Sequence, residues 1–190
     1  MSIIYSEDET FNKVDFTENF IEKGEYENCN FINCNFYGSD LNEIIFSDCD
    51  FKGCDLSLAK LSETAIRDCR FKDCKMIGLN FDDCKSFGLS FSFDTCSLKH
   101  TSFYNLKIKK TIFKNSSLEE SDFTDCDLRE ACFDNCDLVG TVFENSIIEK
   151  VDFRNSFNYS IDPERNRIKK AKFSVNSIAG LLDKYDINIY

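Results

Sequence analysis

The chain has 190 residues, enough for one domain with a sizeable core. Its 34 acidic and 23 basic side chains disfavour direct nucleic-acid binding through a basic face. One proline and seven glycines leave no flexible linker, and no apolar run is long enough to span a membrane. The first residues do not form a signal peptide, so we expect a soluble, cytoplasmic protein.

A large apolar residue recurs at every fifth position. One series covers residues 11–91 with a single lapse, at Ser86, and a second covers residues 93–153. Seventeen of the twenty phenylalanines lie on these two series or at a later position, Phe173. A period of five fits neither a helix nor a plain strand, so the pattern predicts a repeat structure.

The position two residues before each large residue mostly holds a small side chain. Residues two apart in an extended chain point to the same side, so each unit is a short strand with two inward side chains, followed by a corner. Cys29, Cys49 and Cys69 lie 20 residues apart, which indicates four units per turn. The pattern predicts a four-sided parallel β-solenoid of roughly seven turns and about 34 Å, with phenylalanine rings stacked inside.

Eleven cysteines raise the question of a metal site or disulfides. Ten of them, all but Cys132, occupy the inward small position, whereas zinc ligands usually come in pairs two to four residues apart. We interpret these cysteines as reduced core residues and expect no metal and no cofactor. His100 is an isolated outward imidazole, and no hydrolase or phosphate-loop motif is present, so we expect no enzymatic activity.

Two places depart from the repeat. Around residues 84–93 two extra residues shift the register, which would bend or offset the rod; this is either a repaired insertion or a recognition feature. After Phe173, Ser174 is placed to cap a helix that covers the open solenoid end or joins two copies, with a short strand at residues 187–190. The apolar stripe of this helix, our predicted dimer contact, comprises Val175, Ile178, Leu181, Leu182 and Tyr185.

Units such as Cys126-Asp127-Leu128 and Cys136-Asp137-Leu138 resemble the A-(D/N)-L-x-x repeat of the pentapeptide-repeat proteins. The resemblance covers about four fifths of the chain. It implies an all-β fold, a right-handed quadrilateral parallel β-helix over residues 1–173. Residues 174–190 would then form the C-terminal capping and dimerisation helix and the short strand.

The C-terminal segment narrows the resemblance. "IDPERNRIKKAKF" (Ile161 to Phe173), followed by "GLLDKYDINI", is similar to the end of the Qnr quinolone-resistance proteins, and "SFGLSF" (Ser86 to Phe91) is similar to another segment of that branch. The branch, with the related mycobacterial MfpA, consists of homodimers that bind DNA gyrase and topoisomerase IV, which implies an acidic rod that imitates DNA. Qnr proteins carry two projecting loops, whereas this sequence has no insertion longer than the two-residue shift, so loop-free MfpA is the other model.

Acidic side chains are concentrated between residues 118 and 152, where eleven carboxylates face two basic residues, whereas residues 98–117 hold five lysines and no acid. Two functions remain open: a non-enzymatic, DNA-mimicking binder of a type II topoisomerase, and a scaffold with an unrelated protein partner. The predicted partner-binding residues are Glu119, Glu120, Asp122, Asp125, Asp127, Glu130, Asp134 and Asp137.

Overall fold

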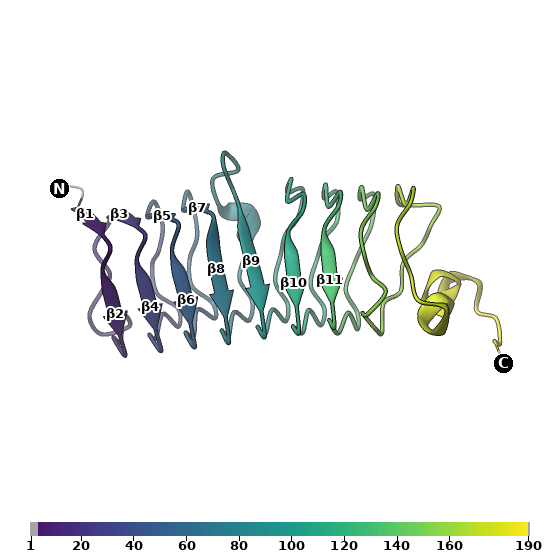
Figure 1. Ribbon diagram of the computed structural model, residues 1–190, viewed down its shortest axis with the longest axis horizontal. Coiled ribbons are helices and arrows are strands. Elements are labelled where there is room, and N and C mark those ends of the chain that lie inside the picture. Colours follow the sequence, from purple (N-terminus) through teal and green to yellow (C-terminus); the bar gives the residue numbers. More distant parts are fainter. Residues whose placement is uncertain (1–3, 190) are drawn as a thin grey trace.

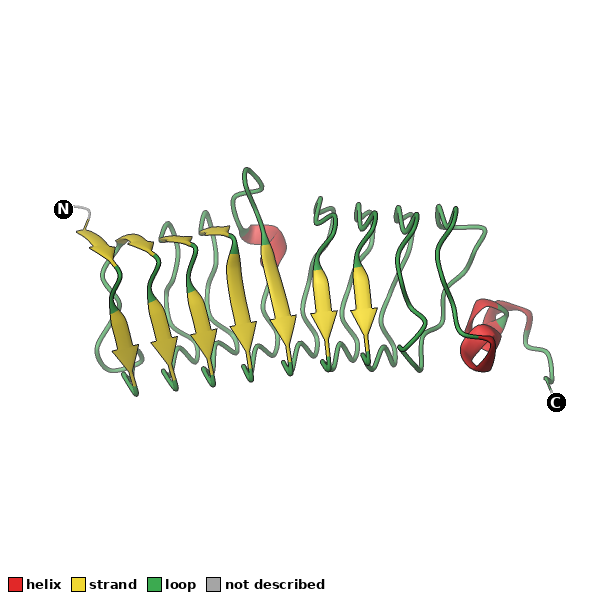
Figure 2. Ribbon diagram, in the orientation of Figure 1, coloured by secondary structure: helices red, strands yellow, loops and turns green. Residues whose placement is uncertain are grey.

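The computed structural model describes residues 4–189 and shows a straight rod made of successive turns of the chain (Figure 1). Short strands lie on one side along most of the rod and on a second side at its N-terminal half, and the helical segments gather mainly at the C-terminal end (Figure 2). The strands are β1 (Ile4–Glu7), β2 (Thr10–Asn12), β3 (Gly24–Glu27), β4 (Asn30–Ile32), β5 (Ile45–Ser47), β6 (Asp50–Lys52), β7 (Ala65–Arg67), β8 (Cys69–Lys72), β9 (Phe91–Asp94), β10 (Ile112–Lys114) and β11 (Cys132–Asp134).

All strand pairs are parallel, and nearly all join residues 20 apart, such as Thr10 with Asn30. They form a seven-stranded sheet, β11-β10-β9-β8-β6-β4-β2, which we call the long sheet, and a four-stranded sheet, β1-β3-β5-β7. Isolated bridges with the same offset, such as Asp15 with Asn35 and Asp40 with Lys60, continue the pairing on the two remaining sides. The predicted four-sided parallel β-solenoid, an all-β fold, is confirmed.

Stacked phenylalanine rings fill the interior. Beneath the long sheet, nine rings from Phe11 to Phe173 form one column, with neighbouring centroids 4.6 to 5.4 Å apart. A second column joins Phe81, Phe103, Phe123 and Phe143. Because each inner ring is covered on both faces, one turn shields the next from water, which is why a flat ring suits this position.

The small inward residues are hydrogen-bond donors. The Cys54 thiol donates to the Phe31 carbonyl (3.3 Å), and the Thr64 hydroxyl donates to the Leu41 carbonyl (2.8 Å), in each case to the large residue of the preceding turn. Cysteine, serine and threonine share the position because each combines a small volume with one rotatable donor. The cysteines are therefore structural, and all eleven are free.

Each corner of the coil turns through a residue with left-handed backbone geometry. Asn28 and Asp48 have φ of 51° and 53°, values that Asn and Asp adopt more readily than most residues. At Gly53 (φ 67°) glycine adopts the left-handed geometry without strain, and an added Cβ would lie 2.3 Å from the Asn33 side-chain oxygen of the preceding turn, so that side chain would have to move.

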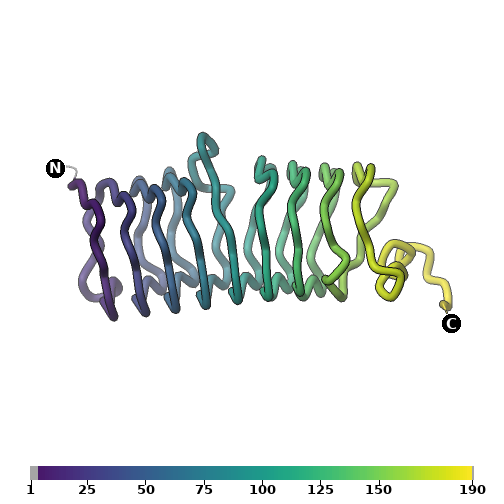
Figure 3. The backbone as a smooth tube through the Cα atoms, viewed as in Figure 1, coloured from purple at the N-terminus to yellow at the C-terminus, as the bar shows by residue number. Residues whose placement is uncertain are grey.

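The register shift near residues 84–93 is present, because β8 pairs with β9 at an offset of 22, with Cys69 opposite Phe91. The extra residues leave the rod as a loop, Ser86–Leu89, which follows the short 3₁₀ helix η1 (Phe81–Asp83) and projects beyond the other turns (Figures 1 and 3). The projecting loop thus arises from the two-residue shift itself, without a longer insertion. Phe91 replaces a small inward residue, is buried and contacts Phe81, which supplies apolar volume that Ser86 does not.

The C-terminal end is covered by two 3₁₀ helices, η2 (Val175–Leu181) and η3 (Asp183–Tyr185). The Ser174 side chain accepts a hydrogen bond from the Asn176 backbone (3.1 Å), so the predicted cap is confirmed. A Cβ on Gly180 would lie 2.0 Å from the Tyr159 carbonyl oxygen, and the Gly180 carbonyl accepts from Ile161 (2.9 Å). Glycine therefore allows the cap to lie directly on the last turn.

The cap differs from the expected single helix with a five-residue apolar stripe. The segment is shorter than the length at which a helix is stable in water, and the hydrogen bond at Gly180 holds its backbone against the solenoid, so tighter 3₁₀ turns form. The predicted terminal strand is also wrong over residues 187–189, which have no strand pairing, while Tyr190 lies outside the described residues.

We expect Phe123→Ala to lower the free energy of unfolding by about 3–5 kcal/mol, because the ring stacks between Phe103 and Phe143 and its loss leaves a cavity. Lys72→Ala, at an exposed position, should stay within about 0.5 kcal/mol of the wild type. Denaturant titration followed by circular dichroism measures both. Equal losses would contradict the assignment of inward and outward positions.

Candidate partner-binding site

The eight acidic residues predicted to bind a partner lie around the rod rather than on one side. Asp122 pairs with Ser102, Asp127 with Lys107, and Asp137 with Ser117, and these are three different columns of the coil. Successive units of five residues occupy successive sides, so a segment of 20 residues goes once around the rod. A local run of acids therefore cannot form one face.

Three of these carboxylates, Glu119, Asp127 and Glu130, are paired with cations, and Glu120 lies beside the imidazole of His100. Glu119 forms an ion pair with Lys99, Glu120 lies 3.2 Å from His100, and Glu130 lies 2.9 Å from Lys150. The two members of each pair are 20 residues apart and thus occupy the same position in adjacent turns. The hydrogen bond from Lys150 lowers the pKa of Glu130 below its usual value. Lys99 and Lys150 therefore neutralise part of the acidic segment once the turns are stacked.

Among the eight predicted residues, Asp127 alone contacts two cations. Arg129 and Lys109 lie 2.6 and 3.4 Å from one of its carboxylate oxygens. Burial raises the pKa of Asp127, but hydrogen bonds from the two cations outweigh it, and the net pKa lies below the usual value. This carboxylate is held by its own chain and is not free for a partner.

Six unpaired carboxylates lie near one corner of the rod. Other unpaired carboxylates lie elsewhere in the described chain: Asp134 and Asp137, for example, accept hydrogen bonds from the Asn155 and Asn158 side chains (2.7 and 2.8 Å). In residues 4–189, the six acids named below have no cationic nitrogen within 4.0 Å. The Glu43 backbone donates to Ser62 and the Glu63 backbone donates to Asp83, so consecutive turns hold them in a row. We call this row the acidic ridge: Glu43, Glu63, Asp82, Asp83, Asp122 and Asp125.

Four of the ridge residues were not among the predicted ones. Glu43, Glu63 and the Asp82-Asp83 pair are separated by whole turns in the sequence and thus form no local acidic run. The sequence could have revealed the row, because Glu43, Glu63 and Asp83 are each 20 residues apart and therefore occupy the same position in successive turns. With turns about 4.8 Å apart, the ridge extends about 19 Å over five turns, so its mean density of about one carboxylate per 3 Å is close to the one phosphate per about 3.4 Å of a DNA strand. The carboxylates are unevenly distributed, because the turn at residues 102–105 has none and the third and fifth turns have two each.

The projecting loop is the second candidate surface. Phe87, near its tip, is 85% exposed, whereas Leu89 packs against the core. Gly88 has φ of 74° and lies over the Arg67 side chain, where an added Cβ would be 3.6 Å from the arginine Cγ and Nε. A large aromatic ring on a short loop anchored at both ends suits protein recognition rather than core packing.

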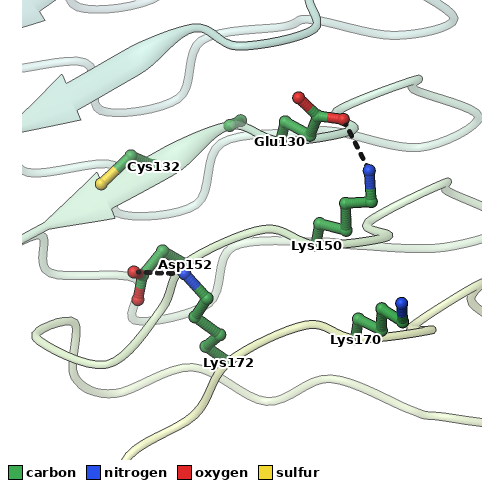
Figure 4. A pocket seen from close by; sticks show the side chains of 7 residues that line it. Glu130, Cys132, Lys150, Asp152, Lys170 and Lys172 are labelled. Atoms are coloured by element: carbon green, nitrogen blue, oxygen red, sulfur yellow. Dashed lines mark hydrogen bonds and ion pairs between the residues drawn. The ribbon is translucent and has the colours of Figure 1, made fainter.

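A shallow groove near the C-terminal end holds mixed charges (Figure 4). Lys150 points to Glu130, and Lys172 lies 3.5 Å from Asp152, whose pKa the Arg154 guanidinium holds at about 2. The half-buried Cys132 opens onto this groove, and burial raises its pKa, which disfavours the reactive thiolate. Across residues 4–189 no group of three His, Cys, Asp or Glu residues could hold a metal ion.

The predicted dimer residues divide into two sets. Val175, Ile178 and Tyr185 are 87%, 44% and 52% exposed, whereas Leu181 packs against the core and Leu182 is half-buried. Positions three apart coincide on a 3₁₀ helix, so Val175 and Ile178 share one face of η2.

Within the described chain, no helix is long and apolar enough to cross a bilayer.

A coil with a five-residue unit and its polar chemistry on outer ridges and loops defines a repeat solenoid. The family model for the pentapeptide repeat region matches residues 24–92 and 89–160. The chain belongs to the pentapeptide-repeat family, as its repeat units indicated.

A solved structure shares the fold. A trypsin-treated variant of QnrB1, a plasmid-mediated fluoroquinolone resistance protein, is 19% identical, with a TM-score of 0.50 over 99% of this chain and 98% of that one. HetL from the cyanobacterium Nostoc sp. strain PCC 7120, a pentapeptide repeat protein involved in regulating heterocyst differentiation, is 14% identical, with a TM-score of 0.36 over 89% and 84%. No curated protein sequence matches the chain.

We expect a thiol reagent to count eleven free thiols in denaturant, and at most the one of Cys132 to react readily in the native protein. Burial raises the pKa of Cys126 and Cys136 to about 12, so these thiols stay protonated and unreactive at about pH 8. Absorbance titration with and without denaturant, alongside elemental analysis for zinc, measures this. A total below eleven, or bound zinc, would contradict the structural role of the cysteines.

Proposed function

We propose that this protein is a non-catalytic binder of a type II topoisomerase, which it contacts through the acidic ridge. The ridge is the observation that carries the proposal, because its carboxylates are unpaired, recur on successive turns at Glu43, Glu63 and Asp83, and are fixed on a stiff rod. The resemblance of residues 161–173 to the end of the Qnr proteins supports the choice of partner. Such a partner works in the cytoplasm, where the proposal places the protein.

The physical basis is competition with DNA. A cleft that holds duplex DNA is lined with positive charge, so a row of carboxylates with a mean charge density near that of one phosphate strand is drawn into it. The ridge residues are Asp and Glu side chains on corners, which need no rearrangement to present their charge. The projecting Phe87 would add an apolar contact beside the electrostatic one.

A protein scaffold with an unrelated partner is the second candidate function. The observation that favours it is the pairing of Glu119 and Glu130 with lysines of adjacent turns, which neutralises part of the acidic segment. A partner would then recognise a mixed surface rather than a DNA-like one. The supercoiling assay below separates the two functions.

We expect the wild type to inhibit DNA supercoiling by purified gyrase, less so as salt screens the carboxylates. The ridge variant Glu43→Gln, Glu63→Gln, Asp82→Asn, Asp125→Asn should need about tenfold more protein for the same inhibition, since it loses four partner contacts of roughly 0.2–1 kcal/mol each.

The matched control is Glu119→Gln, Glu120→Gln, Glu130→Gln, Glu144→Gln, which removes the same charge from carboxylates that are already paired. It should stay within about threefold of the wild type. Equal weakening of both variants would mean that only net charge matters. A wild type that leaves supercoiling untouched at large excess would leave the scaffold as the better function.

We also propose a homodimer through η2, because Val175 and Ile178 present apolar side chains to solvent at the rod end. Ile178→Glu should convert the dimer into a monomer with an unchanged melting temperature, since the side chain is not part of the core. Analytical ultracentrifugation measures the mass. Leu181→Glu places a charge where the cap packs against the core, so it should lower the melting temperature instead. A monomeric wild type at micromolar concentration would contradict the dimer.

A further inference from the structure

The backbone ladder is interrupted on the side of the rod that carries the projecting loop. Lys85 and Ser90 donate to the preceding turn, at Thr64 and Ile66 (2.9 and 3.0 Å), and Ile108 donates to the following turn, at Asp127 (3.0 Å). Within the described chain, no backbone hydrogen bond joins residues 85–90 to residues 107–110. This side therefore contains an open strand edge in the middle of the rod.

Four cations surround the interruption. Asn80 pairs with Ser102. Five residues further on, Lys85 and Lys107 therefore occupy equivalent positions in adjacent turns. We call the cluster the loop-side basic patch: Arg67, Lys85, Lys107 and Lys110.

Over the whole of residues 4–189, no member of the patch has a carboxylate within 4.0 Å. The neighbouring Lys109 differs, because it is paired with Asp127 (3.4 Å). The patch thus concentrates unpaired positive charge on a protein whose net charge is −11.

Two further features at the same place point to a ligand. The Nε of Arg67 is buried and has no hydrogen-bond partner among the described residues, although guanidinium donors are normally satisfied when buried. It lies under Gly88, next to Phe87, whose ring is exposed. The site therefore combines an open backbone edge, unpaired cations and an aromatic side chain.

We propose that the loop-side basic patch binds an acidic, extended segment of another protein. Its carboxylates would pair with Lys85, Lys107 and Lys110, its backbone would meet the open edge at Lys107, and an apolar side chain would contact Phe87. Charge complementarity favours an acidic peptide, because the four cations of the patch have no carboxylate partner in the described chain.

Nucleic acid fits the patch less well. The acidic ridge residues Asp82 and Asp83 precede the loop directly in the chain, and Asp68 is hydrogen-bonded to Ser90 (2.9 Å) beside it. A regular polyphosphate would have to cross these carboxylates, whereas a short peptide can avoid them. The inference does not depend on the topoisomerase proposal: both surfaces include Phe87, but their charged residues differ, so the lysine variants test the patch alone.

The test is fluorescence anisotropy with a fluorescein-labelled peptide of alternating glutamate and aspartate around a central leucine pair. We expect the full-length wild type to bind it at low salt, and Lys107→Glu with Lys110→Glu to bind at least about tenfold more weakly. Phe87→Ser should weaken binding about threefold or more with an unchanged melting temperature, since the ring is exposed.

The matched control is Lys52→Glu with Lys72→Glu, which changes the net charge equally on the long sheet. Both variants place a new carboxylate beside an existing one, Asp127 or Asp94, and in the control the two new carboxylates also face each other, so the melting temperature of both variants is measured alongside. The control should keep the affinity within about twofold of the wild type. The proposal is overturned by a wild type that does not bind the peptide, by equal weakening in the control, or by tighter binding of labelled single- or double-stranded DNA of equal charge.

Discussion

The structure depends on one constraint: each turn of the coil has unpaired backbone groups and an exposed inner face until the next turn covers them. Parallel pairing at a fixed offset and stacked phenylalanine rings satisfy both requirements at once. The thiols and hydroxyls at the small positions add a further tie between turns, as from Cys54 to Phe31. The end of the coil needs a cap for the same reason, and the contact between Gly180 and Tyr159 shows how closely the cap follows the last turn.

The same constraint organises the surface. Because equivalent residues of adjacent turns lie about 4.8 Å apart, charges 20 residues apart in the sequence become neighbours. Lys99 and Glu119 neutralise each other in this way, whereas Glu43 and Glu63 reinforce each other. A repeat rod thus arranges its charge in columns along its axis, and a partner recognises columns rather than sequence segments.

The projecting loop breaks the regularity at small cost to the core. The ring column passes it, with Phe71 and Phe93 stacked at 5.4 Å, while Phe91 fills the interior. The backbone hydrogen-bond ladder is interrupted on the loop side. Backbone groups and cations there have no partner within the described chain. Loops on rigid scaffolds commonly carry binding functions, since the scaffold holds them in place without taking part in recognition.

The five-residue period determined the fold almost completely, because inward positions, turn length and the phenylalanine columns all follow from residue phase alone. The helix cap at Ser174 was equally local and could be predicted from its side chain. Tertiary structure alone decided which carboxylates are free, since Glu119 and Asp125 look alike in sequence and differ only in what the adjacent turn places beside them. It also decided that the two extra residues leave the coil as a loop, and that the cap forms 3₁₀ turns, because the close packing of neighbouring turns and the contact at Gly180 act between residues far apart in the sequence.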